Sequence, residues 1–456
     1  MVNTLKCVLK EARINNFKSL KDLRVSLDRF NVIVGRNASG KTNFVEFFRF
    51  LKNALVEERR PYMPYIEWWS YHNIVWEGKE QLPIVAGLKF EIDGYDVDYE
   101  VVFSIAGGIF SILDEQLTID RSVFVERRGQ LLKIRHSEEF IKANVQKVQK
   151  LLDLTRGFPF GDTKKRITKD YLLGAQVRLP TDFSNLIDLP RTLLIPMLST
   201  SYRDMSISCM LDLGSPRKVE EPIVIILPAP KTKKAPPPVM TIFDGLRSAI
   251  NNFIVLKHPS MKEVKSPSAP RKEEVLSEDA TNLHNILFYW FQKEGGKIPE
   301  RIERGLTKLF PNIQIRPSLT SDGKVFIKMY DKGIELDPPC IPDGLYKILT
   351  VLAAIELKPS LLAVDEIENS LYAEALEYVI DELKNSETTV IVTTHSPLVV
   401  DMVKLEDLFI VERTAEGTVL KKIENPEEIR EKLKELKITQ SESWIYGGLS
   451  ERHQKS

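Results

Sequence analysis

The stretch NVIVGRNASGKTNF, residues 31–44, decides how the rest of this sequence is interpreted. It begins as an apolar, β-branched strand and continues through a loop bounded by Gly35 and Gly40. It then enters a segment whose phenylalanine and leucine residues recur at three- and four-residue steps, as on one face of a helix. A strand, a glycine-bounded loop and a helix in this order surround an anion with backbone N–H groups and with the positive end of the helix dipole.

The spacing matches G-x-x-x-x-G-K-[ST], which predicts a phosphate-binding loop. Gly40 lets the backbone approach the phosphates, Lys41 reaches the β and γ oxygens, and the Thr42 hydroxyl is a ligand for Mg²⁺. The predicted binding residues of the loop are Gly35, Arg36, Asn37, Ala38, Ser39, Gly40, Lys41, Thr42 and Asn43.

Two acidic residues follow an apolar run in LLAVDEIENSL, residues 361–371. At the end of a strand, Asp365 is placed to bind Mg²⁺ through water, together with Thr42. Glu366 is then free to orient and deprotonate an attacking water, which makes it a candidate catalytic residue. The alternative is an acidic first turn of the next helix, which the helix dipole would favour.

A third polar strand end occurs in VIVTTHSP, residues 390–397. Ligands of open α/β sheets bind at the carboxyl ends of the strands, so His395 is a candidate for contacting a γ-phosphate or its attacking water. With Lys41 and Glu366 it completes the predicted catalytic set. The other histidines have no such placement and are interpreted as structural or exposed: His72, His136, His258, His284 and His453.

Composition excludes some classes of partner. The 64 Lys and Arg residues balance the 64 Asp and Glu residues, so no global charge draws this chain to nucleic acid or to an anionic membrane. Cys7, Cys209 and Cys340 are scattered without metal-ligand spacing, and we interpret them as core thiols of a reducing compartment. No run approaches the length of a membrane span, so we expect a cytoplasmic protein without membrane contact.

The pattern along the chain predicts an α/β fold in three parts. Residues 1–135 combine the phosphate loop with an antiparallel β meander between about residues 82 and 134. Residues 136–335 are expected to form a mainly helical insertion with Pro- and Lys-rich loops, irregular over 211–275. In residues 336–456, apolar β-branched strands alternate with helices, which predicts a parallel sheet covered on both faces.

These elements together resemble the ATP-binding-cassette (ABC) type of ATPase, and within it the RecF, Rad50 and SMC-like group. The compact family of AAA-type, RecF-like ATPases, without coiled coil or Toprim domain, is the nearest in pattern. The landmarks are INNFKSLKDLRVSLDRFNVIVGRNASGKTNFVEFFRFL, SEDATNLHNILFYW, IPDGLYKILTVLAAIEL, LLAVDEIENSLYAEAL, VIVTTHSPLVVD and SESWIYGGL. They cover both ends of the chain well and its middle loosely.

This resemblance implies a P-loop head that binds ATP with Mg²⁺ and dimerises around it. It implies that Asn16–Ser19 border the nucleotide, that Asn369–Tyr372 form the D-loop, and that Pro342–Gly344 stand where the signature motif stands. We call Pro342–Gly344 the signature-like segment; its Asp343 and Gly344 would contact the ATP of a partner copy. Pro342 departs from the family's serine and offers neither hydroxyl nor N–H.

Two further departures from the family pattern concern other motifs. Tyr372 and Ala373 replace a common His-Pro pair, and Gln81 is the candidate for the Q-loop glutamine.

Several functions stay open at this level. The favoured one is an ATPase that acts on DNA or controls a separate effector such as a nuclease, in genome maintenance or phage defence. The alternative is a slow, nucleotide-gated scaffold without direct nucleic-acid binding. Glu382 and Lys384 form an E-x-K of the kind nucleases use, but neighbouring apolar residues place them on the wet face of a helix, so we expect no DNA cleavage by this chain.

Overall fold

The computed structural model describes residues 6–56, 63–105, 108–129, 131–136, 174–178, 239–257 and 260–449. The chain divides into two compact units, and the division passes within one helix, between Arg49 and Phe50. Unit 1 comprises residues 1–18 and 50–251, and unit 2 comprises residues 19–49 and 252–456. Each unit is described separately.

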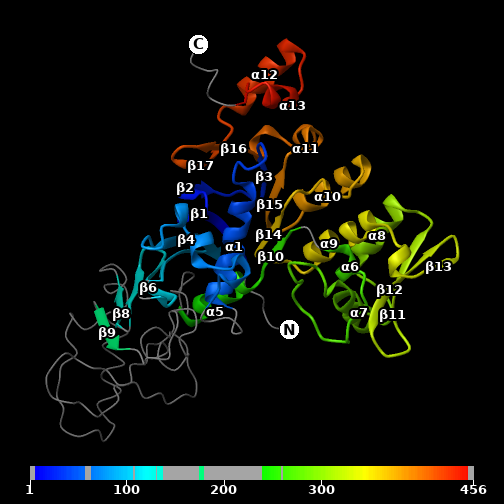
Figure 1. Cartoon of the computed structure of the whole chain (residues 1–456), viewed down its shortest axis with the longest axis horizontal. Coiled ribbons are helices and arrows are strands. Elements are labelled where there is room, and N and C mark those ends of the chain that lie inside the picture. Colours follow the sequence, from blue (N-terminus) through cyan, green and yellow to red (C-terminus); the bar gives the residue numbers. More distant parts are fainter. Residues whose placement is uncertain are drawn as a thin grey trace, which may run out of the picture. The chain divides into compact units, whose positions relative to one another are not determined.

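The centre of unit 2 is a six-stranded sheet of order β10-β14-β15-β3-β16-β17 (Figure 1). Neighbouring strands from β10 to β16 run parallel, and β17 pairs antiparallel with β16 at the edge. This confirms the predicted parallel sheet, whose short apolar strands are buried on both faces. The strands are β3 (Phe30–Val34), β10 (Phe253–Leu256), β14 (Leu361–Val364), β15 (Thr389–Thr394), β16 (Leu408–Thr414) and β17 (Gly417–Lys422).

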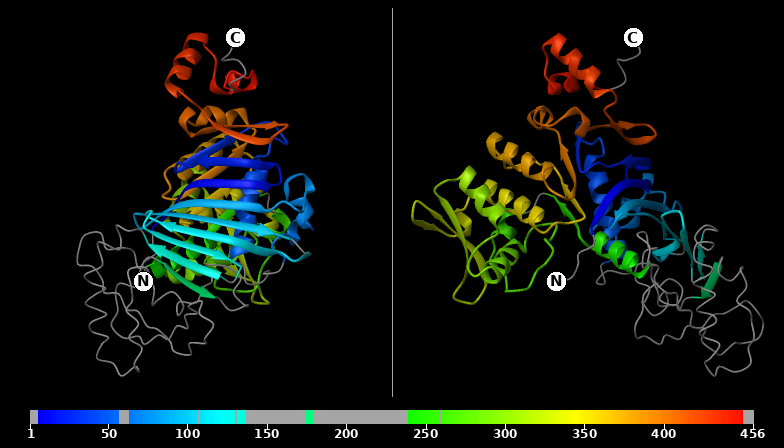
Figure 2. Two further views of the ribbon diagram at one scale, coloured as in Figure 1. Left: turned by 90° about the vertical axis from the view of Figure 1, so that its left-hand side faces the viewer. Right: turned by 180° about the vertical axis from the view of Figure 1, so that it is seen from behind.

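Helices cover this sheet on both sides. Helix α1 (Lys41–Leu55) starts on one side, and α9 (Asp343–Glu356) and α10 (Ala373–Lys384) lie on the other (Figures 1 and 2). Every residue of α9 from Leu345 to Ile355 is buried, which matches its nearly uniform apolar sequence. The remaining helices of unit 2 are α6 (Met261–Val264), α7 (Leu283–Lys293), α8 (Glu300–Leu309), α11 (Pro397–Met402), α12 (Pro426–Leu436) and α13 (Gln440–Ile445).

Two smaller features complete unit 2. The strands β2 (Leu20–Ser26), β11 (Ile313–Leu319), β12 (Val325–Asp331) and β13 (Ile334–Leu336) lie outside the central sheet. Of these, β11, β12 and β13 form a three-stranded antiparallel sheet.

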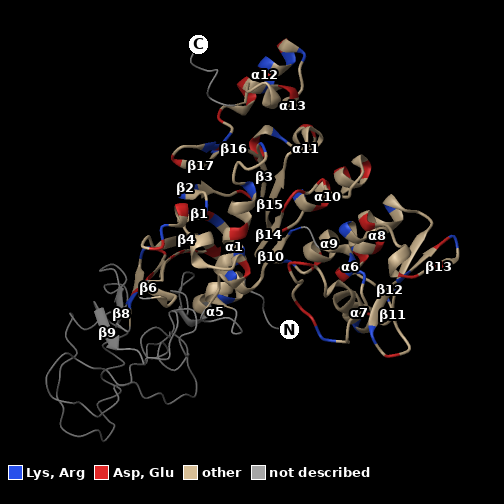
Figure 3. Cartoon of the chain, in the orientation of Figure 1, with Lys and Arg blue, Asp and Glu red and all other residues tan. Residues whose placement is uncertain are grey.

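The helices of unit 2 carry charges of both signs. Lys and Arg are interspersed with Asp and Glu along α8, α10 and α12 (Figure 3).

Unit 1 contains an antiparallel sheet whose strands follow in the order β1-β4-β5-β6-β7-β8-β9, seen face-on in the left view of Figure 2. It confirms the predicted meander. Its elements are β1 (Cys7–Phe17), β4 (Ile84–Ile92), β5 (Tyr95–Ser104), β6 (Ser111–Ile119), β7 (Val123–Arg128), β8 (Leu131–His136), β9 (Gly174–Arg178) and helix α5 (Val239–Asn251). A buried ion pair joins neighbouring strands, with Arg127 2.5 Å from Glu115 and the Tyr99 hydroxyl donating to the same carboxylate at 2.6 Å.

Two expectations from the sequence meet a different result. Strand β10 lies within residues 211–275, yet it pairs with β14 as part of the central sheet instead of forming irregular structure. The four apolar residues of β10 are too short a run to indicate a strand when Pro- and Lys-rich sequence lies on both sides. The core-thiol interpretation is wrong for Cys340, which is exposed at the end of a short 3-10 turn (Pro338–Cys340), whereas Cys7 is half-buried.

Some expectations are not decided. Cys209, most of the predicted helical segment 138–210 and the Pro-rich stretch 214–238 lie outside the described residues. The three-part division of the chain stays a prediction. Across the described ranges, every helix is too short or too polar to cross a membrane.

Candidate nucleotide site

Three neighbouring strands, β14, β15 and β3, bring the polar strand ends of unit 2 together. They are adjacent and parallel, with Val364 paired to Val392 and Thr394 paired to Val34. Because parallel strands end at the same edge of a sheet, the segments that follow them meet there. The phosphate loop follows β3, the acidic segment follows β14 and the histidine follows β15.

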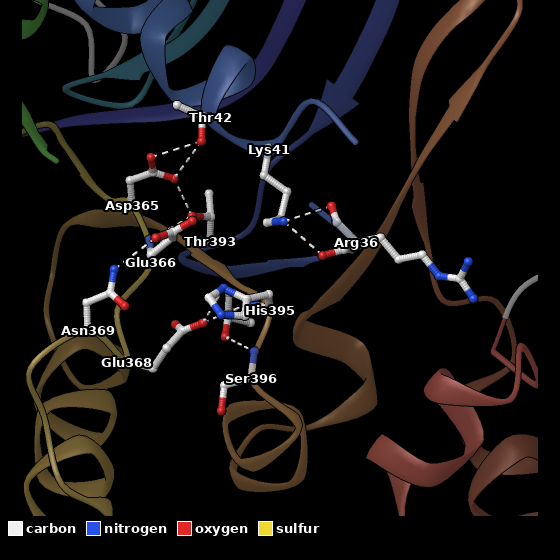
Figure 4. Close-up of polar contacts among 12 residues, drawn as sticks. Arg36, Lys41, Thr42, Asp365, Glu366, Glu368, Asn369, Thr393, His395 and Ser396 are labelled. Carbon is white, nitrogen blue, oxygen red and sulfur yellow. Dashed lines mark hydrogen bonds and ion pairs between the residues drawn. The ribbon is translucent and has the colours of Figure 1, made fainter. Parts of the chain in front are cut away.

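The loop after β3 folds around its own lysine. Lys41 is the first residue of α1 and is only 5% exposed. Its ammonium donates to the backbone carbonyls of Gly35 at 2.8 Å and Arg36 at 3.1 Å (Figure 4). Burial lowers the pKa of Lys41, and three carboxylates oppose this change, that of Glu366 most strongly. The result is a desolvated cation held among oxygen atoms at the start of a helix.

A threonine from β17 fixes the tightest point of the loop. Gly40 has φ +109°, a conformation that L side chains rarely adopt. A Cβ atom there would lie 2.2 Å from the hydroxyl oxygen of Thr418. That hydroxyl lies 3.0 Å from the carbonyl oxygen of Ser39 and 2.7 Å from the hydroxyl of Ser19, which also accepts a bond from Asn43 at 2.7 Å. Only glycine fits at this position.

Asp365 meets the hydroxyl of the phosphate loop directly. It follows β14, is 3% exposed, and its carboxylate accepts a hydrogen bond from Thr42 at 3.0 Å (Figure 4). The hydroxyl of Thr393, in β15, donates to the other carboxylate oxygen. A carboxylate and a hydroxyl are oxygen donors of the kind Mg²⁺ binds, so these residues fit the ion that the sequence implied.

Glu366 stands in a strained position beside this pair. Its φ is +47°, in the left-handed region that is uncommon for residues other than glycine. Its backbone N–H donates to the Thr393 hydroxyl at 2.9 Å, and its carboxylate accepts from the Asn369 amide at 2.8 Å. Backbone outliers of this kind occur at functional sites, where surrounding bonds hold them. Here the bonds to Thr393 and Asn369 hold the backbone and the carboxylate of Glu366.

His395 is held by an acid from the same segment. The carboxylate of Glu368 lies 3.0 Å from His395 Nδ1 and accepts the backbone N–H of His395 at 2.8 Å (Figure 4). The imidazole is 44% exposed. Glu368 thereby fixes both the ring orientation and the backbone of the turn after β15.

The signature-like segment starts α9. Pro342 and Asp343 are exposed, and Asp343 pairs with the ammonium of Lys265 at 2.6 Å. Gly344 packs against the D-loop segment, because a Cβ atom there would lie 2.7 Å from the carbonyl oxygen of Ser370. In the described residues no hydrogen bond or ion pair links Asp343 or Gly344 to the phosphate loop of the same chain.

The structure therefore brings together most, but not all, of the predicted site residues. Lys41, Thr42, Asp365, Glu366 and His395 meet at one sheet edge. Arg36, Asn37 and Ala38 are exposed, and the Arg36 side chain points away from Lys41 in Figure 4. Gln81 is exposed ahead of β4 and belongs to the other unit, so its Q-loop assignment stays a prediction.

The sequence alone missed several residues of the site. Thr393 bonds both Asp365 and the N–H of Glu366, and Glu368 holds His395. The sequence could have indicated Thr393 and Glu368, because both are polar residues at or shortly after the end of an apolar strand. Thr418 carried no signal, because its role depends on β17 lying beside the loop.

Glu382 and Lys384 do not resemble a nuclease site. Both oxygens of Glu382 accept bonds from arginines of α8, Arg301 and Arg304, and Lys384 lies 4.0 Å from Asp407. Each charge is paired within the unit, in agreement with the helical interpretation. Where residues are described, no group of three or more His, Cys, Asp or Glu side chains is arranged to hold a metal ion.

Two protein-family models match the chain. Residues 8–187 match the model described as AAA ATPase domain, and residues 257–401 match the one described as AAA domain, putative AbiEii toxin, Type IV TA system. The first match contains the phosphate loop and the second contains the acidic pair and the histidine. Two long segments of this chain are therefore similar to AAA-type ATPase domains.

Solved structures similar to this chain include an SMC head domain from Thermotoga maritima, at 13% identity and TM-score 0.40, covering 91% of this chain and 99% of that one. Another is the SmcHead bound to the C-winged helix domain of ScpA, at 12% identity and TM-score 0.44, covering 93% and 99%. A third is RecF with ATP, at 13% identity and TM-score 0.37, covering 92% and 99%. Among curated proteins no sequence match is found.

Proposed function

We propose that this chain binds ATP with Mg²⁺ and hydrolyses it at the edge formed by β3, β15 and β14. The observation that supports this most directly is the Thr42 hydroxyl on the Asp365 carboxylate at 3.0 Å, beside a buried lysine inside a glycine-bounded loop. These groups come from distant parts of the sequence. Together they supply the cation, the N–H groups and the oxygen ligands that a nucleotide phosphate chain with Mg²⁺ requires.

Each residue has a proposed role. Lys41 exchanges the two loop carbonyls for phosphate oxygens, and Thr42 and Asp365 are the oxygen donors for Mg²⁺, which when bound neutralises charge on the phosphates. Glu366 accepts the proton of the attacking water, held in position by Asn369. His395, oriented by Glu368, contacts the γ-phosphate or that water.

Phosphate release by the purified protein tests this proposal. Lys41→Ala should reduce turnover by about 10² or more, because a charge that stabilises the transition state is lost. Glu366→Gln should keep ATP affinity and lose turnover, since the amide has the shape of the carboxylate but cannot accept the proton. Lys434→Ala, an exposed lysine of α12, is the matched control. Normal turnover by Lys41→Ala would contradict the assignment.

We further propose that two copies close around ATP. The supporting observation is that the start of α9 exposes Pro342 and Asp343, with its first N–H groups facing outward from a long helix. The signature-like segment of one copy would cover the ATP held by Gly40–Thr42 of the other. Light scattering of Glu366→Gln with ATP should therefore give twice the monomer mass, and a monomer with ATP bound would contradict the composite site.

The proposed target of ATP binding and hydrolysis is DNA or a separate effector protein, in DNA repair or phage defence. A slow, nucleotide-gated scaffold is the second candidate, and Pro342 favours it, because a residue without hydroxyl or N–H cannot donate to phosphate from that position. Turnover measured with and without duplex and single-stranded DNA separates the two candidates. Stimulation by DNA supports the first, and slow turnover that DNA leaves unchanged supports the second.

A further inference from the structure

An ion pair beside the nucleotide site has no part in the proposed roles. The ammonium of Lys257 donates to the carboxylate of Glu46, although 211 positions separate the two residues in the chain. Glu46 belongs to α1, and Lys257 directly follows β10. The glutamate is buried, whereas the lysine is partly exposed. The pair therefore joins the helix of the phosphate loop to the edge strand of the central sheet.

Each partner lies next to a group that is proposed to bind Mg²⁺. Glu46 comes four residues after Thr42, so the two side chains lie on the same face of α1, one turn apart. Strand β10 pairs in parallel with β14, and the backbone N–H of Asp365 donates to the Leu256 carbonyl at 2.8 Å. Lys257 follows Leu256, so it leaves the sheet beside Asp365.

Two polar links consequently connect α1 with the ends of β14 and β10. The first is the hydrogen bond from the Thr42 hydroxyl to Asp365, at 3.0 Å (Figure 4). The second is the pair of Glu46 with Lys257, one turn further along α1. The first link opens in the proposed function, because both of its oxygen atoms turn to Mg²⁺. The second link can persist, since neither of its residues is a proposed ligand.

Stability alone does not explain this ion pair. Taking a carboxylate out of water costs free energy that the attraction to one lysine only partly returns, and apolar residues of similar volume often serve a fold equally well or better. An ion pair in such a position provides registry, because the opposite charges meet in one arrangement of the two elements. Registry matters to Mg²⁺, which tolerates little deviation from octahedral geometry.

We propose that Glu46 and Lys257 are positioning residues of the nucleotide site. They keep α1 in register with the sheet edge, so that Thr42 and Asp365 present their oxygen atoms to one ion. This inference rests on the proposed ATPase function. The pair acts through Thr42 and Asp365, not by contact with the nucleotide. It also gives a role to β10, the strand within a stretch of sequence that was expected to be irregular.

The variant that tests the pair removes both charges and keeps the bulk of the side chains. Glu46→Met combined with Lys257→Met leaves the net charge of the chain unchanged, so an altered metal affinity reports geometry and not a lost charge. The matched control is the same double replacement in the other ion pair of α1, between Arg49 and Glu278. Arg49 lies two turns from Thr42, and Glu278 lies in the segment between α6 and α7.

Binding of a fluorescent ATP analogue, measured with Mg²⁺ and with EDTA, is a readout that needs no hydrolysis. In EDTA, the variant with Glu46→Met and Lys257→Met should bind the analogue within about twofold of the unchanged protein, because the phosphate loop is retained. In Mg²⁺ it should bind at least about tenfold more weakly, as when residues that orient metal ligands are replaced. The control with Arg49→Met and Glu278→Met should match the unchanged protein in both conditions.

Charge reversal, turnover and unfolding complete the test. Glu46→Lys combined with Lys257→Glu restores an attraction between the same two positions, so in Mg²⁺ it should bind the analogue at least about threefold more tightly than the double methionine variant. In the double methionine variant kcat should fall about tenfold or more. Its midpoint of denaturant unfolding should equal that of the unchanged protein or be higher.

The outcomes separate a positioning role from a purely structural one. A folded double methionine variant with unchanged affinity in Mg²⁺, an equal loss of affinity in the control, or failure of the double methionine variant to fold would overturn the proposal. A purely structural ion pair predicts those results. Absence of turnover in the unchanged protein would instead contradict the ATPase function, and the comparison of analogue binding would still test the ion pair.

Discussion

Adding one methyl group at Gly40 should damage the phosphate loop in a way that can be calculated from the structure. The Cβ atom of an alanine would lie 2.2 Å from the hydroxyl oxygen of Thr418, 2.7 Å from its Cγ2 atom and 2.9 Å from the hydroxyl oxygen of Ser19. The backbone at φ +109° would also become strained. Neither effect requires a ligand, so both appear in the free protein.

The magnitude follows from the two effects. Holding a residue other than glycine in a sparsely populated backbone region costs about 1–3 kcal/mol. The displaced Thr418 is 3% exposed and gives up its contacts to Ser39 and Ser19, each worth about 1 kcal/mol. We therefore expect Gly40→Ala to destabilise unit 2 by about 3–5 kcal/mol, unless the loop rearranges and loses its affinity for phosphate instead.

The assay is a thermodynamic cycle with Thr418→Ala, followed by denaturant unfolding and by binding of a fluorescent ATP analogue. Thr418→Ala alone should destabilise the protein through its lost hydrogen bonds. In the Gly40→Ala background, Thr418→Ala also removes the steric clash. The loss of unfolding free energy that Thr418→Ala causes there should therefore be smaller, by about 1–2 kcal/mol, than in the unchanged protein. Additive effects of the two changes, or a Gly40→Ala variant that matches the unchanged protein in both stability and ATP binding, would refute the reasoning.

Three further variants test other parts of the structure. Thr393→Val keeps the shape of the side chain but removes the hydroxyl that donates to Asp365 and accepts the N–H of Glu366, so kcat should fall at least about tenfold, and the melting temperature should fall because two polar groups lose a partner. Burial lowers the pKa of His284 to about 4 from 6.5, so the folded state favours the neutral ring. Below pH 6.5 the unfolded chain takes up the proton first, and stability should fall by about 3 kcal/mol between pH 6.5 and 4, a loss that His284→Gln should remove in unfolding measured against pH. Arg127→Met deprives the buried Glu115 of this cation and should destabilise unit 1 by about 3–5 kcal/mol, measured by denaturant unfolding; an unchanged midpoint would count against the ion pair.

The strand ends of the nucleotide site could be predicted from the sequence because their signals are local. Short apolar, β-branched runs followed by Gly35, by Asp365 and by His395 indicated parallel strands, and parallel strands end at one edge. The expectation that Thr42 and Asp365 act together needed no coordinates. The structure places their oxygen atoms 3.0 Å apart, although 323 residues separate them in the chain.

Residues whose role arises from packing could not be predicted in the same way. Thr418 reaches the loop from an edge strand that pairs antiparallel with β16, and nothing in GTVLKK identifies that neighbour.

The physical reason is the range of the interactions. A phosphate loop is encoded by backbone conformation and residue type within one short segment, so its sequence determines its chemistry. The space around Gly40 and the hydrogen bonds of Asp365 are set by residues far away in the sequence. The sequence therefore determined which groups could bind a nucleotide, and the tertiary structure decided which distant side chains, Thr418 and Thr393 among them, hold those groups in place.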